Sequence, residues 1–173
     1  MVKYSAEIKD GKLLGIGLTN MNIEKLKKGM PILVKLPDLK ILTGWNGSIV
    51  IMYGKTKKAI KREIKQASLG KIKYIDRIGE ILKFSFTIRG EKTLGIGINE
   101  SHTNKLIEWI PFKIEYQDLK DLTGWEGKIL LSCGDSEEDI REELSDYIGE
   151  NTKIIDKKKE YIEKHLKGKE NGD

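Results

Sequence analysis

The chain has 173 residues, of which 38% are hydrophobic and 34% charged, and its formal net charge is +5. This is enough apolar sequence for a buried core. It has no run of about 18 apolar residues and no apolar leader, so we expect a cytoplasmic protein without a membrane span. The single cysteine, Cys133, excludes an internal disulfide and a cysteine-based zinc site, and the two histidines, His102 and His165, are far apart, so we expect no metal and no cofactor.

The first half of the chain predicts a mixture of strands and helices. Apolar or alternating segments bounded by turn residues predict strands at residues 4–8, 13–18, 31–36, 48–53 and 71–77. Apolar residues at helical spacing predict helices at residues 20–28 and 55–68, and residues 37–47 are expected to form a loop. Asp10-Gly11 is typical of a hairpin turn. Thr19 or Asn20 can cap the first helix, and Gly29 can end it.

The second half of the chain repeats the first without a gap. Leu14-Gly15-Ile16-Gly17 aligns with Leu94-Gly95-Ile96-Gly97, and Leu42-Thr43-Gly44-Trp45 aligns with Leu122-Thr123-Gly124-Trp125. About a third of the aligned positions are identical, which indicates an internal tandem repeat.

We therefore predict an α+β fold of two repeated ββαββα(β) units, residues 1–80 and 81–160, packed as a pseudo-twofold fused dimer. Helices of the second unit are expected at residues 101–109 and 136–148. A charged C-terminal helix and tail are expected at residues 157–173.

The sequence predicts no catalytic residues in either unit. Ser, His and Asp do not recur together, since His102 aligns with Asn22, so we expect a non-enzymatic protein. Gly54-Lys55-Thr56 follows a strand and opens a helix, as in a phosphate-binding loop, but the position of that motif's first glycine is Ile49. This argues against a nucleoside triphosphatase. Two alternatives stay open, an anion bound at the helix N-terminus and a simple turn with Thr56 near the cap.

The glycines of the two Gly-Ile-Gly segments are candidate ligand-binding residues. Gly15 and Gly17 lie on one face of the predicted strand, as Gly95 and Gly97 do, and leave a strip without side chains. Because glycine weakens a strand, the strip is expected to accommodate either a flat ligand or the close packing of a helix or of the other unit.

The Leu-Thr-Gly-Trp loop is the second candidate binding segment. A base could stack on Trp45 while Lys40 and Thr43 hold ribose or phosphate, or the indole could fill the end of its own core. Equivalent roles are expected of Lys120, Thr123 and Trp125. Asp38 and Asp118 are predicted to cap these loops. Since duplication copies any site carried by one unit, we expect such a pocket to occur twice.

The second helix has opposite charge in the two units. Residues 55–65 are strongly basic, whereas residues 135–143 are strongly acidic. A duplex-binding pair of helices would be basic twice, so nucleic acid is the less favoured partner. The opposite signs favour mutual contact, with a homo-oligomer joined through these helices, or two solvated surfaces.

Each unit has a glycine-rich strand, a short helix, a strand led by proline, and a glycine before a charged helix. This pattern resembles small single-domain proteins of unknown function from bacteria and their phages. In class and size the chain is similar to phage anti-defence sponges, which sequester the nucleotide second messengers of Thoeris and CBASS immunity. The resemblance implies a binding protein that sequesters a small nucleotide-like signal. The alternatives are a module that inhibits or assembles a protein partner, and a single-stranded nucleic-acid binder.

Overall fold

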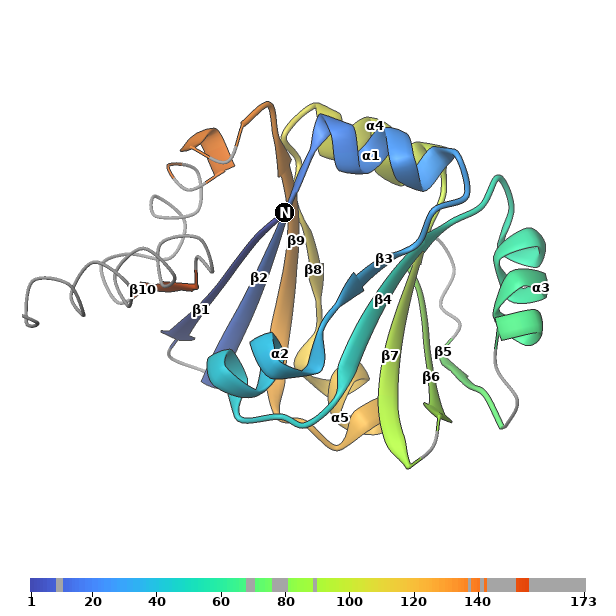
Figure 1. Cartoon of the computed structure of the whole chain (residues 1–173), viewed down its shortest axis with the longest axis horizontal. Helices are drawn as coiled ribbons and strands as arrows, with labels where there is room; N and C mark the ends of the chain where they lie inside the picture. Colours follow the sequence, from blue (N-terminus) through green and yellow to red (C-terminus); the bar gives the residue numbers. More distant parts are fainter. Residues whose placement is uncertain are drawn as a thin grey trace, which may run out of the picture.

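The computed structural model describes residues 1–8, 11–67, 71–75, 81–88, 90–136, 138–140, 142 and 152–155, which form two five-stranded sheets (Figure 1). Sheet A has the order β10-β1-β2-β9-β8, formed by Thr152–Ile155, Val2–Ile8, Gly11–Thr19, Gly127–Gly134 and Phe112–Ile114. Sheet B has the order β3-β4-β7-β6-β5, formed by Ile32–Val34, Ser48–Tyr53, Glu91–Ile98, Leu82–Ile88 and Lys73–Ile75. The helices are α1 (Asn20–Lys27), α2 (Leu36–Thr43), α3 (Lys57–Ala67), α4 (Glu100–Ile107) and α5 (Tyr116–Thr123).

Each sheet takes its central strands from both units. In sheet A, β2 of the first unit pairs in parallel with β9 of the second, and Ile16 lies opposite Leu131. In sheet B, β4 of the first unit pairs in parallel with β7 of the second, and Ile49 lies opposite Leu94. The order β10-β1-β2-β9-β8 becomes β5-β6-β7-β4-β3 when each strand is replaced by its counterpart in the other unit. The predicted α+β class is confirmed, and the two units exchange strands reciprocally.

The space between the sheets forms the main core. Alternating residues of the four central strands point into it, because successive side chains of a strand face opposite sides. They include Leu14, Ile16, Leu18, Ile49, Ile51, Leu94, Ile96, Ile98, Ile129 and Leu131. Figure 1 shows α1 and α4 at one end of this space and α2 and α5 at the other. Each of these four helices adds at least one leucine to the core, and α1 also adds Ile23. The helices therefore close both ends of the sandwich.

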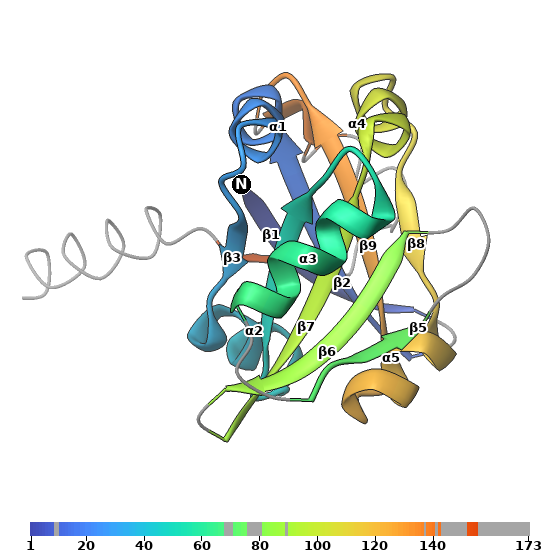
Figure 2. The same cartoon turned by 90° about the vertical axis from the view of Figure 1, so that its right-hand side faces the viewer.

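Helix α3 covers the outer face of sheet B (Figure 2). Ile60 and Ile64, one turn apart, pack against Leu82, Phe84 and Phe86. The predicted apolar face of this helix is therefore confirmed. None of the helices in the described ranges has the length and hydropathy of a bilayer-crossing segment.

The predicted loop at residues 37–47 is wrong, because α2 forms there and α5 forms in the equivalent segment. Pro37 lies in the first turn of α2, where the missing N–H costs no helical hydrogen bond. Gly44 ends the helix with a left-handed φ of 78°. Leu39 and Leu42 supply the buried apolar face. Among the described residues, α2 and α5 are thus helices that the sequence analysis did not predict.

Some predicted elements fall outside the described residues. These are the Asp10 position of the first hairpin turn, most of the helix at residues 136–148, and the C-terminal helix at 157–173. Residues 138–140 and 142 are helical, as α3 is at the equivalent positions. The boundary between the units at residues 80 and 81 stays a prediction.

Expression of residues 1–80 alone tests the strand exchange. This segment lacks the parallel neighbours of β2 and β4, so we expect two copies to supply them to each other and form a homodimer. Light scattering should give the mass of a dimer, and its thermal unfolding temperature should fall on dilution. A folded monomer with concentration-independent unfolding would contradict the exchange.

Candidate functional site

The two tryptophans of the Leu-Thr-Gly-Trp segments stack on each other. The ring centroids of Trp45 and Trp125 lie 6.0 Å apart, and the ring planes differ by 16°. Each indole also covers a glycine, since a Cβ on Gly47 would lie 1.9 Å from the Trp45 ring and one on Gly127 would lie 2.2 Å from the Trp125 ring. One face of each indole is therefore occupied by the other unit, a contact that neither predicted role included.

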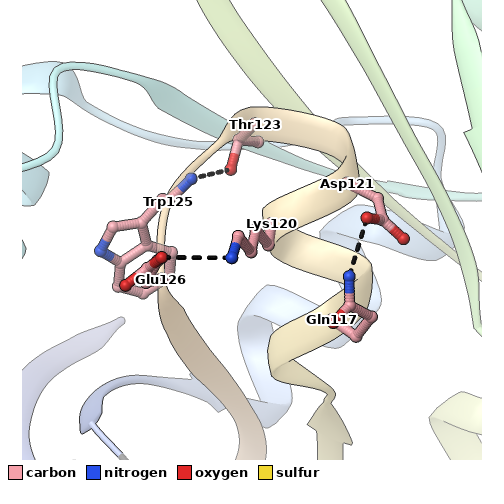
Figure 3. A network of polar contacts seen from close by, with 6 residues as sticks. All are labelled: Gln117, Lys120, Asp121, Thr123, Trp125 and Glu126. Atoms are coloured by element: carbon pink, nitrogen blue, oxygen red, sulfur yellow. Dashed lines mark hydrogen bonds and ion pairs between the residues drawn. The ribbon is translucent and has the colours of Figure 1, made fainter.

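The hydroxyl groups beside the tryptophans have structural hydrogen-bond partners. Figure 3 shows the Leu-Thr-Gly-Trp segment of the second unit, in which the backbone N–H of Trp125 donates to Thr123 Oγ1 at 3.1 Å. The same hydroxyl donates to the Leu119 carbonyl at 2.8 Å, and Thr43 forms both equivalent bonds. Lys120 pairs with Glu126 at 3.4 Å on the surface, where an ion pair contributes little stability. Lys40 is exposed on α2.

Side chains fill the glycine strips of both units. A Cβ on Gly15 would lie 1.5 Å from the Tyr4 ring, and one on Gly95 would lie 1.9 Å from the Phe84 ring. The second glycine of each strip lies against a helical isoleucine of the other unit, Ile140 for Gly17 and Ile60 for Gly97. Close packing of a helix of the other unit, one of the two predicted alternatives, therefore describes Gly17 and Gly97, whereas Gly15 and Gly95 are covered by a ring from the neighbouring strand of their own unit.

A buried ion pair joins the first strand of each unit to its second helix. Lys3 Nζ lies 2.5 Å from Asp38 Oδ2, and Lys83 pairs with Asp118 in the same way. Both aspartates are almost completely buried. The expectation that they cap a loop is replaced by a role in holding α2 and α5 against β1 and β6. Loss of one partner would leave an uncompensated buried charge, which costs about 3–5 kcal/mol.

A cavity of about 260 Å³ lies where the parallel strands β4 and β7 end. Its wall consists of Lys57, Ile60, Leu82, Gly97, Asn99, Ser101 and His102. The Gly54 N–H donates to the Ile98 carbonyl at 3.1 Å, which joins the two strand ends before α3 and α4 diverge. In open α/β sheets, ligands bind in such crevices, beyond the carboxyl ends of parallel strands whose connections diverge. We therefore take this cavity as the candidate binding site.

His102 contributes a neutral imidazole to the cavity wall. It is 8% exposed, and burial, together with the positive charge of Lys105, holds its pKa below the usual range. The Asn99 N–H donates to His102 Nδ1 at 3.0 Å, and the His102 N–H donates back to Asn99 Oδ1 at 3.1 Å. This reciprocal cap uses Nδ1 as an acceptor, so the proton of the neutral ring is on Nε2. The ring therefore offers a donor to a ligand.

The start of α3 adds positive charge to the same cavity. Lys57 is the first residue of α3, and the first turn contains no acidic residue. The Thr56 hydroxyl accepts the Ala59 N–H at 3.1 Å, which confirms the predicted cap. Lysines near a helix N-terminus oppose the helix dipole, at a cost of about 0.3–1 kcal/mol each. Positive charge placed against this local preference favours an anion as the occupant of the cavity.

The cavity can bind a ligand through hydrogen-bond donors, but the structure shows no pair of groups suited to nucleophilic catalysis there. Ser101 and His102 are adjacent in a helix, so their side chains do not face each other. No group of three or more His, Cys, Asp or Glu side chains that could hold a metal occurs in the part of the chain that the structure describes. The sequence-predicted ligand residues lie elsewhere, apart from Gly97, which lines the cavity.

The sequence analysis missed His102 because the residue was compared only with Asn22 as a possible catalytic group. The signal that could have found it is the capping pattern, in which Asn99 precedes His102 by one helical turn. Thr19 and Asn22 have the same spacing and form the same cap in the first unit. The pairing of β4 with β7, which brings Lys57 to this histidine, had no signal in the sequence.

Comparison with known proteins does not add a family to this description. No family model, curated protein or solved structure matches the chain. The functional conclusion therefore depends on the geometry of the cavity.

The Trp–Trp contact predicts coupled stability effects. Trp45→Ala should lower the free energy of unfolding by about 3–5 kcal/mol, and Trp45→Phe should cost much less. Because the rings stack, Trp45→Ala and Trp125→Ala together should cost less than the sum of the two, by about 0.5–1.5 kcal/mol. Urea denaturation of the wild type, the two single alanine variants and the double variant measures this coupling. Strict additivity would show that the stack contributes nothing.

The lowered pKa of His102 predicts a loss of stability in acid. The folded protein binds a proton at this ring less readily than the unfolded chain, whose histidine pKa is about 6.5. The neutral imidazole therefore contributes its full share of the folding stability above that pH, and this share declines as the pH falls below it. His102→Asn, which reproduces the Asn22 cap of the first unit, should reduce this dependence. The measurement is the urea midpoint of both proteins at pH 7.5 and 5.5, and equal changes would contradict the assignment.

Proposed function

We propose that the chain is a non-enzymatic, cytoplasmic binding protein that sequesters a small anionic, nucleotide-like molecule in the cavity between α3 and α4. The observation that carries this proposal is the convergence of Lys57, Ser101 and the neutral His102 at the carboxyl ends of β4 and β7. These groups come from both units, so the site depends on the strand exchange.

The composition of the wall supports an anionic ligand with an apolar portion. Lys57 and the Nε2–H of His102 are donors, and Ser101 adds a hydroxyl. Ile60 and Leu82 form the apolar part of the wall, and both pack against Gly97. A few polar groups in an otherwise apolar lining are typical of small-molecule sites.

The size of the cavity limits what it can hold. At about 260 Å³ it is slightly smaller than typical small-molecule pockets of about 300–1,000 Å³. This volume suits a phosphorylated sugar, and the base of a nucleotide would extend beyond it.

The hydrogen bonding of His102 supports binding without turnover. A general base needs an acceptor nitrogen, and Nδ1 is already used by the Asn99 N–H. In this tautomer Nε2 is a donor. The ring can therefore hold an oxygen of the ligand but does not offer a lone pair to remove a proton.

A separate surface feature favours the alternative of a protein partner. Trp109 is 45% exposed, and Ile107 and Ile110 beside it are 45% and 48% exposed. Trp109 has a φ of 65°, a left-handed conformation that Gly29 adopts at the equivalent position of the first unit. An exposed tryptophan at a position that suits glycine is consistent with an interaction surface.

Native mass spectrometry of the protein purified from cells tests the proposed function. We expect a nucleotide-sized mass bound to the wild type, and its loss or a decrease of at least tenfold in occupancy with Lys57→Glu or His102→Asn. Loss of one charge-assisted hydrogen bond, at about 1.5–3 kcal/mol, corresponds to roughly this change in affinity. Lys40→Glu is the matched control, because Lys40 is exposed on α2, at the other end of the sandwich (Figure 1), and should leave binding unchanged.

Other outcomes of this experiment would contradict the proposal. A bound mass that survives both cavity variants would place the ligand elsewhere, and the absence of any small bound mass would argue against sequestration. A protein-sized partner lost on Trp109→Gly would support the interaction module instead. Chemical change of the released ligand by the wild type alone would indicate an enzyme.

A further inference from the structure

The two units are equivalent in fold and repeat Ile60 and Gly97 of the cavity as Ile140 and Gly17, but the polar residues that line the cavity are not repeated. The pseudo-twofold counterpart of the cavity, called the second copy below, lies between the end of β2 next to α1 and the helical residues around Ile140. Sequence alignment places Glu137 at the position of Lys57, Asn22 at that of His102 and Met21 at that of Ser101. Each of the three polar groups that point to an anion is therefore changed in the second copy.

The structure of the second copy also differs at its entrance. Asn20 Nδ2 donates to Asp135 Oδ1 at 2.6 Å, which ties the first residue of α1 to the segment after β9. Cys133 Sγ donates to the Asn20 carbonyl oxygen, Oδ1, at 3.7 Å. The sequence alignment places Glu100 and Lys55 at the positions of Asn20 and Asp135. The second copy is therefore bridged by an amide–carboxylate hydrogen bond and carries negative charge where the first carries a lysine.

The donors of the α3–α4 cavity match one chemical group. Lys57 is at the start of α3, and Ser101 and His102 are in the first turn of α4, so the donors come from two helices. His102 is nine-tenths buried, and its ring packs edge-on against Phe112 with centroids 5.1 Å apart. Within the described residues its ring makes one hydrogen bond, through Nδ1, and Nε2 makes none. Three donors from two helices suit the terminal oxygens of a phosphate better than the two oxygens of a planar carboxylate, which prefers the fork of an arginine.

We propose that the α3–α4 cavity binds the terminal phosphate of its ligand and that each chain holds one such ligand, because the pseudo-twofold copy of the site is bridged and acidic. This inference rests on the proposed function and adds the chemical class of the bound group and the stoichiometry. It replaces the symmetry expectation of two equivalent pockets at the tryptophan loops.

Calorimetric titration with three probes tests the ligand class: inorganic phosphate, adenosine 5′-monophosphate and adenosine. The two phosphates should bind with one site per chain and shift the His102 imidazole signals in NMR spectra, whereas adenosine should bind at least tenfold more weakly. Lys57→Glu and His102→Asn should each weaken phosphate binding at least tenfold. Asp135→Lys should leave it unchanged, because Asp135 belongs to the second copy.

A transplanted site tests the stoichiometry. The variant Met21→Ser, Asn22→His, Asp135→Lys, Glu137→Lys gives the second copy the serine, the histidine and the two lysines of the first. We expect it to bind two phosphates per chain. Since this variant could lose stability, its circular dichroism and melting temperature are measured alongside those of Asp135→Lys with Glu137→Lys, which alters only charge.

The possible failures can be told apart. Equal binding of adenosine and its monophosphate at His102 would overturn the phosphate assignment and leave the proposed function standing. Two phosphates per wild-type chain would overturn the single site. If none of the three probes shifts His102, the phosphate inference fails, and the bound mass seen by native mass spectrometry decides the proposed function independently.

Discussion

The parallel pairing of β2 with β9 and of β4 with β7 is the constraint on which the rest of the structure depends. Each pair joins one strand from each unit, so neither sheet is complete within one half of the chain. Adjacent parallel strands end at the same edge, and the helices that follow them begin side by side. The cavity between α3 and α4 is a direct consequence, since α3 belongs to the first unit and α4 to the second.

The features that recur in both units hold this scaffold together. Tyr4 and Phe84 fill the space above Gly15 and Gly95, and each Gly-Ile-Gly segment also receives an isoleucine from the other unit. The stacked tryptophans and the buried Lys–Asp pairs are likewise duplicated. A close approach that needs glycine, or a buried charge that needs a partner, restricts both copies equally. Repetition in this chain therefore indicates packing.

The features that differ between the units are the better candidates for function. Both units adopt the same backbone fold, so a residue that differs between them is not one that the fold requires. Lys57 begins α3 against the preference of the helix dipole, and the sequence alignment places a residue of opposite charge, Glu137, at this position of the second unit. His102 and Asn22 form the same cap, but only the imidazole adds a ring nitrogen that can donate to a ligand. Divergence after duplication thus separates the proposed binding groups from the framework that positions them.

The sequence by itself determined the tandem repeat, the α+β class, most strands and the apolar face of α3, because these depend on local periodicity and turn residues. It did not reveal α2 and α5, because residues 37–47 were expected to form a loop, although Pro37 fits the first turn of a helix. Only the tertiary structure decided that Trp45 stacks on Trp125 and that Lys57 and His102 line the same cavity. These contacts arise from pairing between strands far apart in the chain, and hydrophobic alternation specifies which face of a strand is buried but not which strand lies beside it.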